Sequence, residues 1–123
     1  MQGHKDLMVW QKAKDLVVAV YGLARTFPKS EVSGLASQMQ RAAVSIPSNI
    51  AEGHGLKQTQ AYSRHFAIAN GSLTELETPL EIANRLGYVS EENRLLIERA
   101  GEIGRMLAGL RRSLQHRALN PEP

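Results

Sequence analysis

At 123 residues, with 42% hydrophobic side chains, the chain has the size of one domain with its own core, and we treat residues 1–123 as that domain. It contains no cysteine, which excludes disulfides and thiolate metal sites, and nothing in its composition implies a cofactor. The start lacks the apolar core of a signal peptide, and no uncharged run approaches membrane-spanning length. We therefore expect a cytoplasmic protein without a membrane partner. A net charge of +3 permits a nucleic-acid partner without requiring one.

The spacing of apolar residues predicts a first helix over residues 7–27, after Asp6 as N-cap and before Pro28, which stops it. Its apolar residues are spaced three and four apart and so share one face, at Trp10, Ala13, Val17, Val20, Ala24 and Phe27. Leu16 and Leu23 widen this apolar face. We interpret Trp10 as a core or interface anchor. A base-stacking role is disfavoured because no basic neighbour is expected on its face.

A second helix is predicted over residues 34–54, with Ser30 or Ser33 as alternative N-caps. Its apolar residues share one face, at Met39, Ala42 and Ile46. The next position of that seam is the polar Asn49. A polar stripe runs beside the seam with spacings of four, three and four, at Arg41, Ser45, Ser48 and Glu52.

Pro47 lies inside this second helix and cannot donate a backbone hydrogen bond, so we expect a kink there. Ser45 and Ser48 are short hydroxyl side chains placed to satisfy the backbone groups that the proline frees. Gly53 and Gly55 are predicted to end the helix.

A third helix is predicted over residues 60–86, with Thr59 as its cap and Gly87 as its glycine terminus. Its seam follows a heptad, at Tyr62, Phe66, Ala69, Leu73, Leu76, Leu80 and Ala83. Gly71 is small enough to let a neighbouring helix approach closely.

A fourth helix is predicted over residues 91–117, capped by Ser90. It repeats the heptad, at Leu96, Ala100, Ile103, Leu107, Leu110 and Leu114. No segment alternates as a strand does. Four long helices with short links predict an all-α, antiparallel up-down-up-down four-helix bundle.

No constellation of residues predicts catalysis or metal binding. A di-iron bundle needs inward-facing Glu-x-x-His pairs, and no glutamate here has a histidine three residues on. The histidines are scattered without ligand spacing, at His4, His54, His65 and His116. The glycines at 53 and 55 are not followed by the Gly-Lys-Ser/Thr of a phosphate-binding loop. We expect a protein that is not an enzyme.

The polar residues around Asn49 form the first candidate site. A buried asparagine needs partners for its donors and acceptors, and Ser72 and Glu75 lie beside the seam of the third helix. We expect a network that joins the second and third helices, made of Ser45, Ser48, Asn49, Glu52, Ser72 and Glu75. A structural role that fixes helix register is favoured over a ligand or RNA contact.

A run of basic residues forms the second candidate site. From residue 105 to 117 the fourth helix carries no acid but several cations, namely Arg105, Arg111, Arg112, His116 and Arg117. A solvated helix end, favoured by the helix dipole, is the commoner outcome of such a run. The functional alternative is a phosphate-binding patch without base readout, to which Arg41 would also contribute.

Four stretches of the chain resemble one bacterial family, named after the intervening sequences of 23S ribosomal RNA genes. Residues 41–53 read Arg-Ala-Ala-Val-Ser-Ile-Pro-Ser-Asn-Ile-Ala-Glu-Gly and are similar to its signature. Residues 7–13, Phe27-Pro28 and residues 69–78 fit the same pattern, so the resemblance covers about residues 6–115. It implies a four-helix bundle and a homopentamer whose subunits surround a central channel. The similar accessory proteins of diversity-generating retroelements bind nucleic acid and a reverse transcriptase.

Our functional hypothesis is a non-catalytic, homo-oligomeric bundle that binds nucleic acid, with structured RNA preferred. A pentamer is the assembly that the resemblance implies. Apolar residues off the main stripe of the first helix are compatible with an interface, at Leu7, Met8, Val9 and Val18. The alternative is a protein-interaction scaffold that recruits a partner protein, in which the basic residues only increase solubility.

Overall fold

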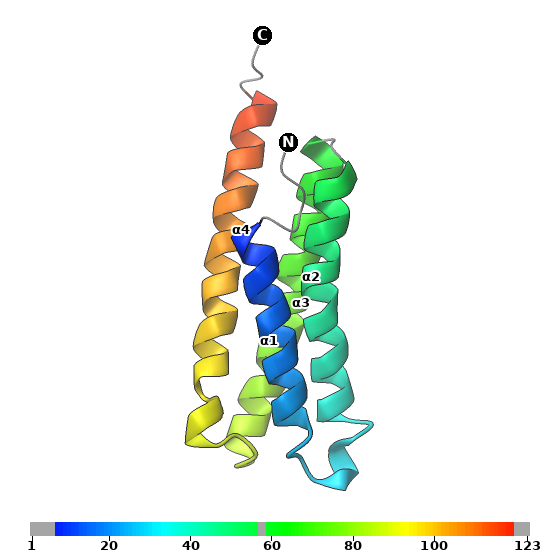
Figure 1. Cartoon of the computed structure of the whole chain (residues 1–123), viewed down its shortest axis with the longest axis vertical. Helices are drawn as coiled ribbons and strands as arrows, with labels where there is room; N and C mark the ends of the chain where they lie inside the picture. The colour runs from blue at the N-terminus through cyan, green and yellow to red at the C-terminus, as the bar shows by residue number, and fades with distance from the viewer. Residues whose placement is uncertain (1–6, 57–58, 120–123) are drawn as a thin grey trace.

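The computed structural model describes residues 7–56 and 59–119, with side chains for 7–55 and 60–116. These residues form four long helices (Figure 1). The helices are α1 (Met8–Ala24), α2 (Leu35–Leu56), α3 (Thr59–Arg85) and α4 (Leu95–Leu119). No described residue lies in a strand. In Figure 1 successive helices run in opposite directions, and α4 returns to the side of α1. The predicted all-α four-helix fold is confirmed.

Helix α1 ends at Ala24, before the predicted boundary at residue 27. The amide and the hydroxyl of Thr26 both donate to the Leu23 carbonyl, at 2.9 and 2.7 Å. In a continuing helix that carbonyl would accept from the Phe27 amide. Phe27 therefore leaves the helix, yet its side chain stays buried and its ring centroid lies 5.3 Å from that of Tyr88.

The predicted caps of α2 and α4 are wrong, because a short 3₁₀ turn precedes each helix: η2 (Lys29–Glu31) and η3 (Glu91–Asn93). The Glu31 carboxylate, and neither Ser30 nor Ser33, accepts a long hydrogen bond of 3.5 Å from the Leu35 amide at the start of α2. Ser90 makes no side-chain cap and instead accepts from the Asn93 amide side chain at 3.1 Å. The predicted caps Asp6 and Thr59 lie outside the residues whose side chains are described.

Gly53 and Gly55 do not end α2, which continues to Leu56. Gly53 is buried against α3, and a Cβ there would lie 2.7 Å from His65 Cβ and 3.2 Å from the Tyr62 carbonyl oxygen. Its missing side chain thus permits a close helix approach. The approach predicted at Gly71 is wrong, since Gly71 is exposed with open space around it.

Gly87 terminates α3 as predicted. Its φ is +81°, a left-handed conformation that glycine adopts without a steric penalty. The Gly87 amide donates to the Asn84 carbonyl at 3.1 Å, and the Tyr88 amide donates to the Ala83 carbonyl at 2.9 Å. This pair of hydrogen bonds is a Schellman motif, which satisfies carbonyl groups at the helix end.

The core consists of the predicted seams, with one shift in α1. All predicted seam residues of α3 and α4 are buried, except that Tyr62 and Leu110 are half-buried. In α1 the buried face includes Val9, which the apolar pattern wrongly placed off the seam, while Trp10 and Val17 lie half-buried at its edge. Both prolines lie inside continuous helices, Pro47 in α2 and Pro79 in α3. The kink at Pro47 stays a prediction.

Candidate functional site

A polar network joins α2 to α3 within an otherwise apolar interface. Ser45 Oγ lies 2.7 Å from Ser72 Oγ across the two helices. Asn49 Nδ2 donates to the Ser45 carbonyl at 2.8 Å and to Ser45 Oγ at 3.0 Å. Ser72 is buried, whereas Ser45 and Asn49 are half-buried. The adjacent helices thus bring together three of the side chains that the sequence suggested for a network.

His65 on α3 is the fourth member, which the sequence-based prediction missed. Its Nδ1 lies 3.0 Å from Asn49 Oδ1. The Ser45 carbonyl can only accept, so Asn49 must point its amide nitrogen there and its Oδ1 toward His65. His65 Nδ1 therefore carries a proton in this contact. His65 stands seven residues before Ser72, on the same edge of α3, and that heptad spacing is the signal that could have identified it.

The last turns of α2 surround His65. Glu52 Oε2 lies 4.0 Å from His65 Nδ1, but the Glu52 side chain is largely exposed. His54 Nδ1 is hydrogen bonded to the Tyr62 hydroxyl, and the Tyr62 ring meets the Phe66 ring edge-on at a centroid distance of 4.6 Å. This end of the α2/α3 hairpin therefore carries both polar and aromatic contacts between the helices.

Two residues expected in the network do not join it. Ser48 is exposed, and its hydroxyl donates to the Val44 carbonyl of its own helix at 2.9 Å. Glu75 is exposed at the edge of a shallow groove between α2 and α3, where Pro79 and Ile82 also lie. Ser48 follows Ser45 by three residues, and Glu75 follows Ser72 by three residues. Both side chains nevertheless lie on the outward face of their helix.

The basic residues of α4 divide into exposed and half-buried positions. Arg105 and Arg112 are seven residues apart and both exposed, so they lie along one outward face. Arg111 is half-buried, and among the described atoms its Nε is buried without a hydrogen-bond partner. His116 is exposed. Arg117 belongs to α4, but its side chain lies outside the described residues.

Arg41 does not group with these residues within one subunit. It is exposed on α2, a helix that packs mainly against α1 and α3, not α4. The first turns of α2 and the last turns of α4 also lie toward opposite ends of the bundle in Figure 1. A shared phosphate surface would therefore need more than one copy of the chain.

An apolar groove lies between α1 and α2. Trp10 and Val18 line it from α1, and Val44 and Pro47 line it from α2. Lys14 Nζ lies 3.7 Å from the centroid of the Trp10 ring, in cation–π contact. The expectation that Trp10 has no basic neighbour on its face was therefore wrong, because Lys14 follows it by one helical turn.

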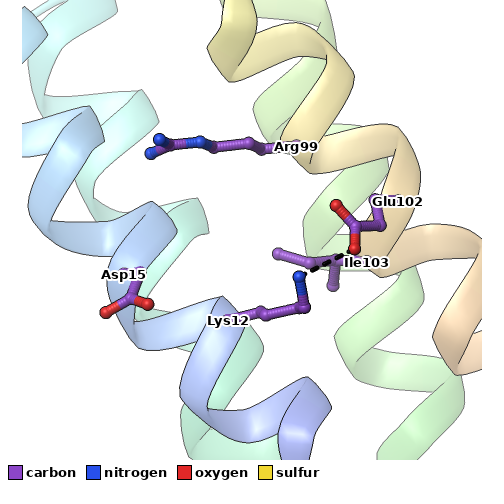
Figure 2. Close-up of a pocket in the computed structure, with 5 residues that line it drawn as sticks. All are labelled: Lys12, Asp15, Arg99, Glu102 and Ile103. Carbon is purple, nitrogen blue, oxygen red and sulfur yellow. Dashed lines mark ion pairs between the residues drawn. The ribbon is translucent and has the colours of Figure 1, made fainter.

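A charged pocket of about 330 Å³ lies between α1 and α4 (Figure 2). Lys12 Nζ and Glu102 Oε1 form an ion pair of 2.8 Å across it. Figure 2 also shows Arg99 reaching from α4 toward α1, where Asp15 stands. The hydrogen bond and the charge of Lys12 lower the pKa of Glu102, and the more distant Arg105 and Arg99 lower it further against a desolvation effect. The apolar periodicity used to find the helices could not reveal this pair.

Neither a membrane span nor a metal cluster occurs in the described part of the chain. None of its helices combines the necessary length and apolarity to cross a bilayer. Across residues 7–56 and 59–119, no group of three or more His, Cys, Asp or Glu residues is arranged to hold a metal ion.

Comparison with known proteins gives one result that identifies a family. No curated protein matches the chain. The family model described as 23S rRNA-intervening sequence protein matches residues 5–109. The match includes the polar network and Arg105, and it ends before Arg111 and Arg112. Because the matched region covers most of the chain, this protein belongs to the 23S rRNA-intervening sequence protein family.

Proposed function

We propose that the protein binds structured RNA as a non-catalytic homo-oligomer, through phosphate contacts made by arginines of α4. The observation that carries this proposal is the outward line of Arg105 and Arg112 on a helix segment without any acidic residue. The family description refers to ribosomal RNA, which supports an RNA-related role. Phosphate contacts of this kind give affinity without base readout.

The local charges favour an anionic ligand. The ion pairs described for the chain involve neither Arg105 nor Arg112. Half-buried Arg111 adds a further positive charge beside them, although its Nε is buried. Arginine guanidinium groups are suited to phosphate because several N–H donors are held in one plane. A phosphate oxygen would therefore meet both charge and hydrogen-bond donors on this part of α4.

One copy of the chain would bind weakly, since it offers few such contacts. A homo-oligomer repeats them, and the second and later contacts of one RNA are then made at high effective concentration. In this proposal Arg41 adds to the surface from a neighbouring copy. The network of Ser45, Asn49, His65 and Ser72 keeps α2 and α3 in register and does not touch the ligand.

The direct test is fluorescence anisotropy of a structured RNA and a matching duplex DNA, titrated with protein at several salt concentrations. We expect log affinity to fall with log salt, with a slope of several units. Replacing Arg105 and Arg112 by glutamine should lower the affinity about tenfold or more and reduce the slope by about one for each lost phosphate contact.

The matched control is Arg94→Gln. Arg94 is an exposed arginine of the turn before α4, and it is paired with Glu91 at 3.3 Å. This variant should bind RNA like the unchanged protein. Equal affinity and slope for the Arg105/Arg112 variant would refute the residue assignment. Absence of binding even at low salt would refute the nucleic-acid function.

A second candidate function is a scaffold that recruits a partner protein. The apolar groove between α1 and α2 favours it, because exposed apolar surface of this kind commonly marks an interface. In that case the arginines of α4 only keep the protein soluble, and RNA binding would be weak at every salt concentration.

A further inference from the structure

The groove between α1 and α2 carries basic charge around an apolar floor. We define the α1/α2 groove by Trp10, Lys14, Val18, Arg25, Val44 and Pro47, which line two adjoining and continuous hollows. Val18 is 73% exposed and Val44 is 41% exposed, although both are apolar. Its charged lining residues are all cations. Arg41, three residues before Val44, is exposed and adds a further positive charge.

The outward side of α3 has the complementary character. Ile68, Glu75 and Ile82 are seven residues apart and all exposed, so they form one line along the helix, which we call the α3 stripe. Ile68 and Ile82 are 44% and 43% exposed. Glu77 and Glu81 are exposed on the same helix, and residues 66–84 contain no cation. The α3 stripe is therefore an apolar surface with negative charge.

From these two surfaces we infer that the α1/α2 groove binds the α3 stripe of a second copy of this chain. Apolar residues would meet apolar residues, while Glu75 would approach Lys14 or Arg25. The groove extends from Trp10 to Arg25, about 22 Å of helix, and the stripe extends over about 21 Å, so their lengths are comparable. This inference rests on the homo-oligomeric part of the proposed function and not on RNA binding.

The charges also determine the type of contact. A symmetric contact of groove with groove would place Lys14 and Arg25 of both copies close together, and stripe with stripe would do the same for Glu75. Like charges at an interface disfavour such pairings. Groove therefore pairs with stripe. Because the groove lies on α1 and α2 and the stripe on α3, we place the two surfaces of one copy against different neighbours, which is a heterologous contact. Repetition of such a contact builds an assembly of more than two copies.

Two variants test the surfaces separately. Val18→Glu places a negative charge in the groove, where it would face Glu75. A double variant, Glu75→Lys with Ile82→Lys, places positive charges on the stripe, where they would face Lys14 and Arg25. All three positions are exposed, so each chain should fold, which circular dichroism checks. Multi-angle light scattering should give the 13.6 kDa monomer mass for each variant alone. The affinity between copies should fall by about a hundredfold or more.

Mixing the two variants gives the decisive result. The Val18→Glu chain keeps an intact stripe, and the lysine variant keeps an intact groove. The intact stripe of the first chain can then bind the intact groove of the second, so the mixture should associate to at least twice the monomer mass, although each variant alone stays monomeric. The matched control Val32→Glu alters another exposed valine, at 65% exposure in a turn outside both surfaces, and it should keep the full assembly.

Each other outcome overturns the inference in a distinguishable way. If Val18→Glu keeps the assembled mass of the unchanged protein, the groove is not the interface, although the homo-oligomer remains. If the lysine variant alone forms a dimer, or the mixture stays monomeric, the contact is not heterologous. If the unchanged protein is a monomer at the highest soluble concentration, both this inference and the homo-oligomeric part of the proposed function fail. RNA affinity is measured separately.

Discussion

The interface between α2 and α3 and the interface between α1 and α4 use polar residues in opposite ways. α2 and α3 approach so closely that Gly53 has no room for a Cβ atom, and a half-buried network links Ser45, Asn49, His65 and Ser72 across the contact. α1 and α4 leave a pocket of about 330 Å³ between them, crossed by the ion pair of Lys12 and Glu102, whose side chains are 40% and 46% exposed.

This difference indicates which helix interface determines the arrangement of the bundle. Polar groups that lose water must find partners in one particular arrangement, so the α2/α3 network penalises any other register of the two helices. Charged groups that stay hydrated gain little from pairing, because solvent screens them. Other arrangements of α1 and α4 would therefore cost little in free energy. We therefore expect substitutions between α2 and α3 to disturb the protein more than those between α1 and α4.

The largest effect is expected for Gly53→Ala. The added Cβ would lie 2.7 Å from His65 Cβ, so α2 and α3 would have to move apart. Such overpacking typically costs about 1–3 kcal/mol. Denaturant unfolding followed by circular dichroism measures the free energy of unfolding.

Gly55→Ala is the matched control for that experiment. Gly55 is exposed in the same helix, and open space surrounds the place of its Cβ. Because alanine favours the helix over glycine, this variant should be as stable as the unchanged protein or slightly more so. If the Gly53→Ala protein has the same free energy of unfolding as the Gly55→Ala protein, α2 and α3 can move apart without loss of stability.

An intermediate effect is expected for Asn49→Leu. It removes the side-chain donor to Ser45 and the hydrogen-bond partner of His65 Nδ1; because both residues are only half-buried, the cost should lie at the lower end of about 1–3 kcal/mol. Helix content should stay unchanged, whereas the melting temperature should fall and the proposed homo-oligomer should lose its single mass.

The control for this substitution is Asn84→Leu. Asn84 is also half-buried, but its side chain makes no hydrogen bond within the described residues, so its replacement should change stability little. An Asn49→Leu protein with unchanged melting and unchanged assembly mass would contradict the role of the network in specifying register.

Periodicity predicted the fold because burial repeats along each helix. The seams from Phe66 to Ala83 and from Leu96 to Leu114 are buried almost as the heptads indicate, since a helix with one apolar face has few ways to bury it. Helix ends were less predictable. The caps at Ser30, Ser33 and Ser90 were wrong, because 3₁₀ turns take up hydrogen bonds that a simple cap would make.

The candidate site was predictable only where its residues lie in or beside an apolar seam. Asn49 was suggested by its position in the seam of the second helix and Ser72 by its position beside that of the third, but the contact of His65 depends on the close approach at Gly53. The sequence shows a glycine there without showing which helix it faces. The pair of Lys12 and Glu102, like the cation–π contact of Lys14, also depends on side-chain directions that apolar spacing does not contain.

The smallest effect is expected for Lys12→Met, and it should depend on pH. Lys12 lowers the pKa of Glu102 in the folded state, chiefly through their hydrogen bond and then through its charge. A lowered folded pKa means that the ionised carboxylate stabilises the fold at pH values above its ordinary pKa of about 4.3. That contribution is lost as the pH falls through the lowered value.

Lys12→Met should therefore raise the pKa of Glu102, observed by NMR titration of its side chain. The difference in melting temperature from the unchanged protein should be greatest near neutral pH at low salt, and it should shrink in high salt or in acid. Both side chains are about 40% or more exposed, so the difference should stay below that of Gly53→Ala. A loss of stability as large as that of Gly53→Ala, or one independent of pH, would mean that the two interfaces do not differ as proposed.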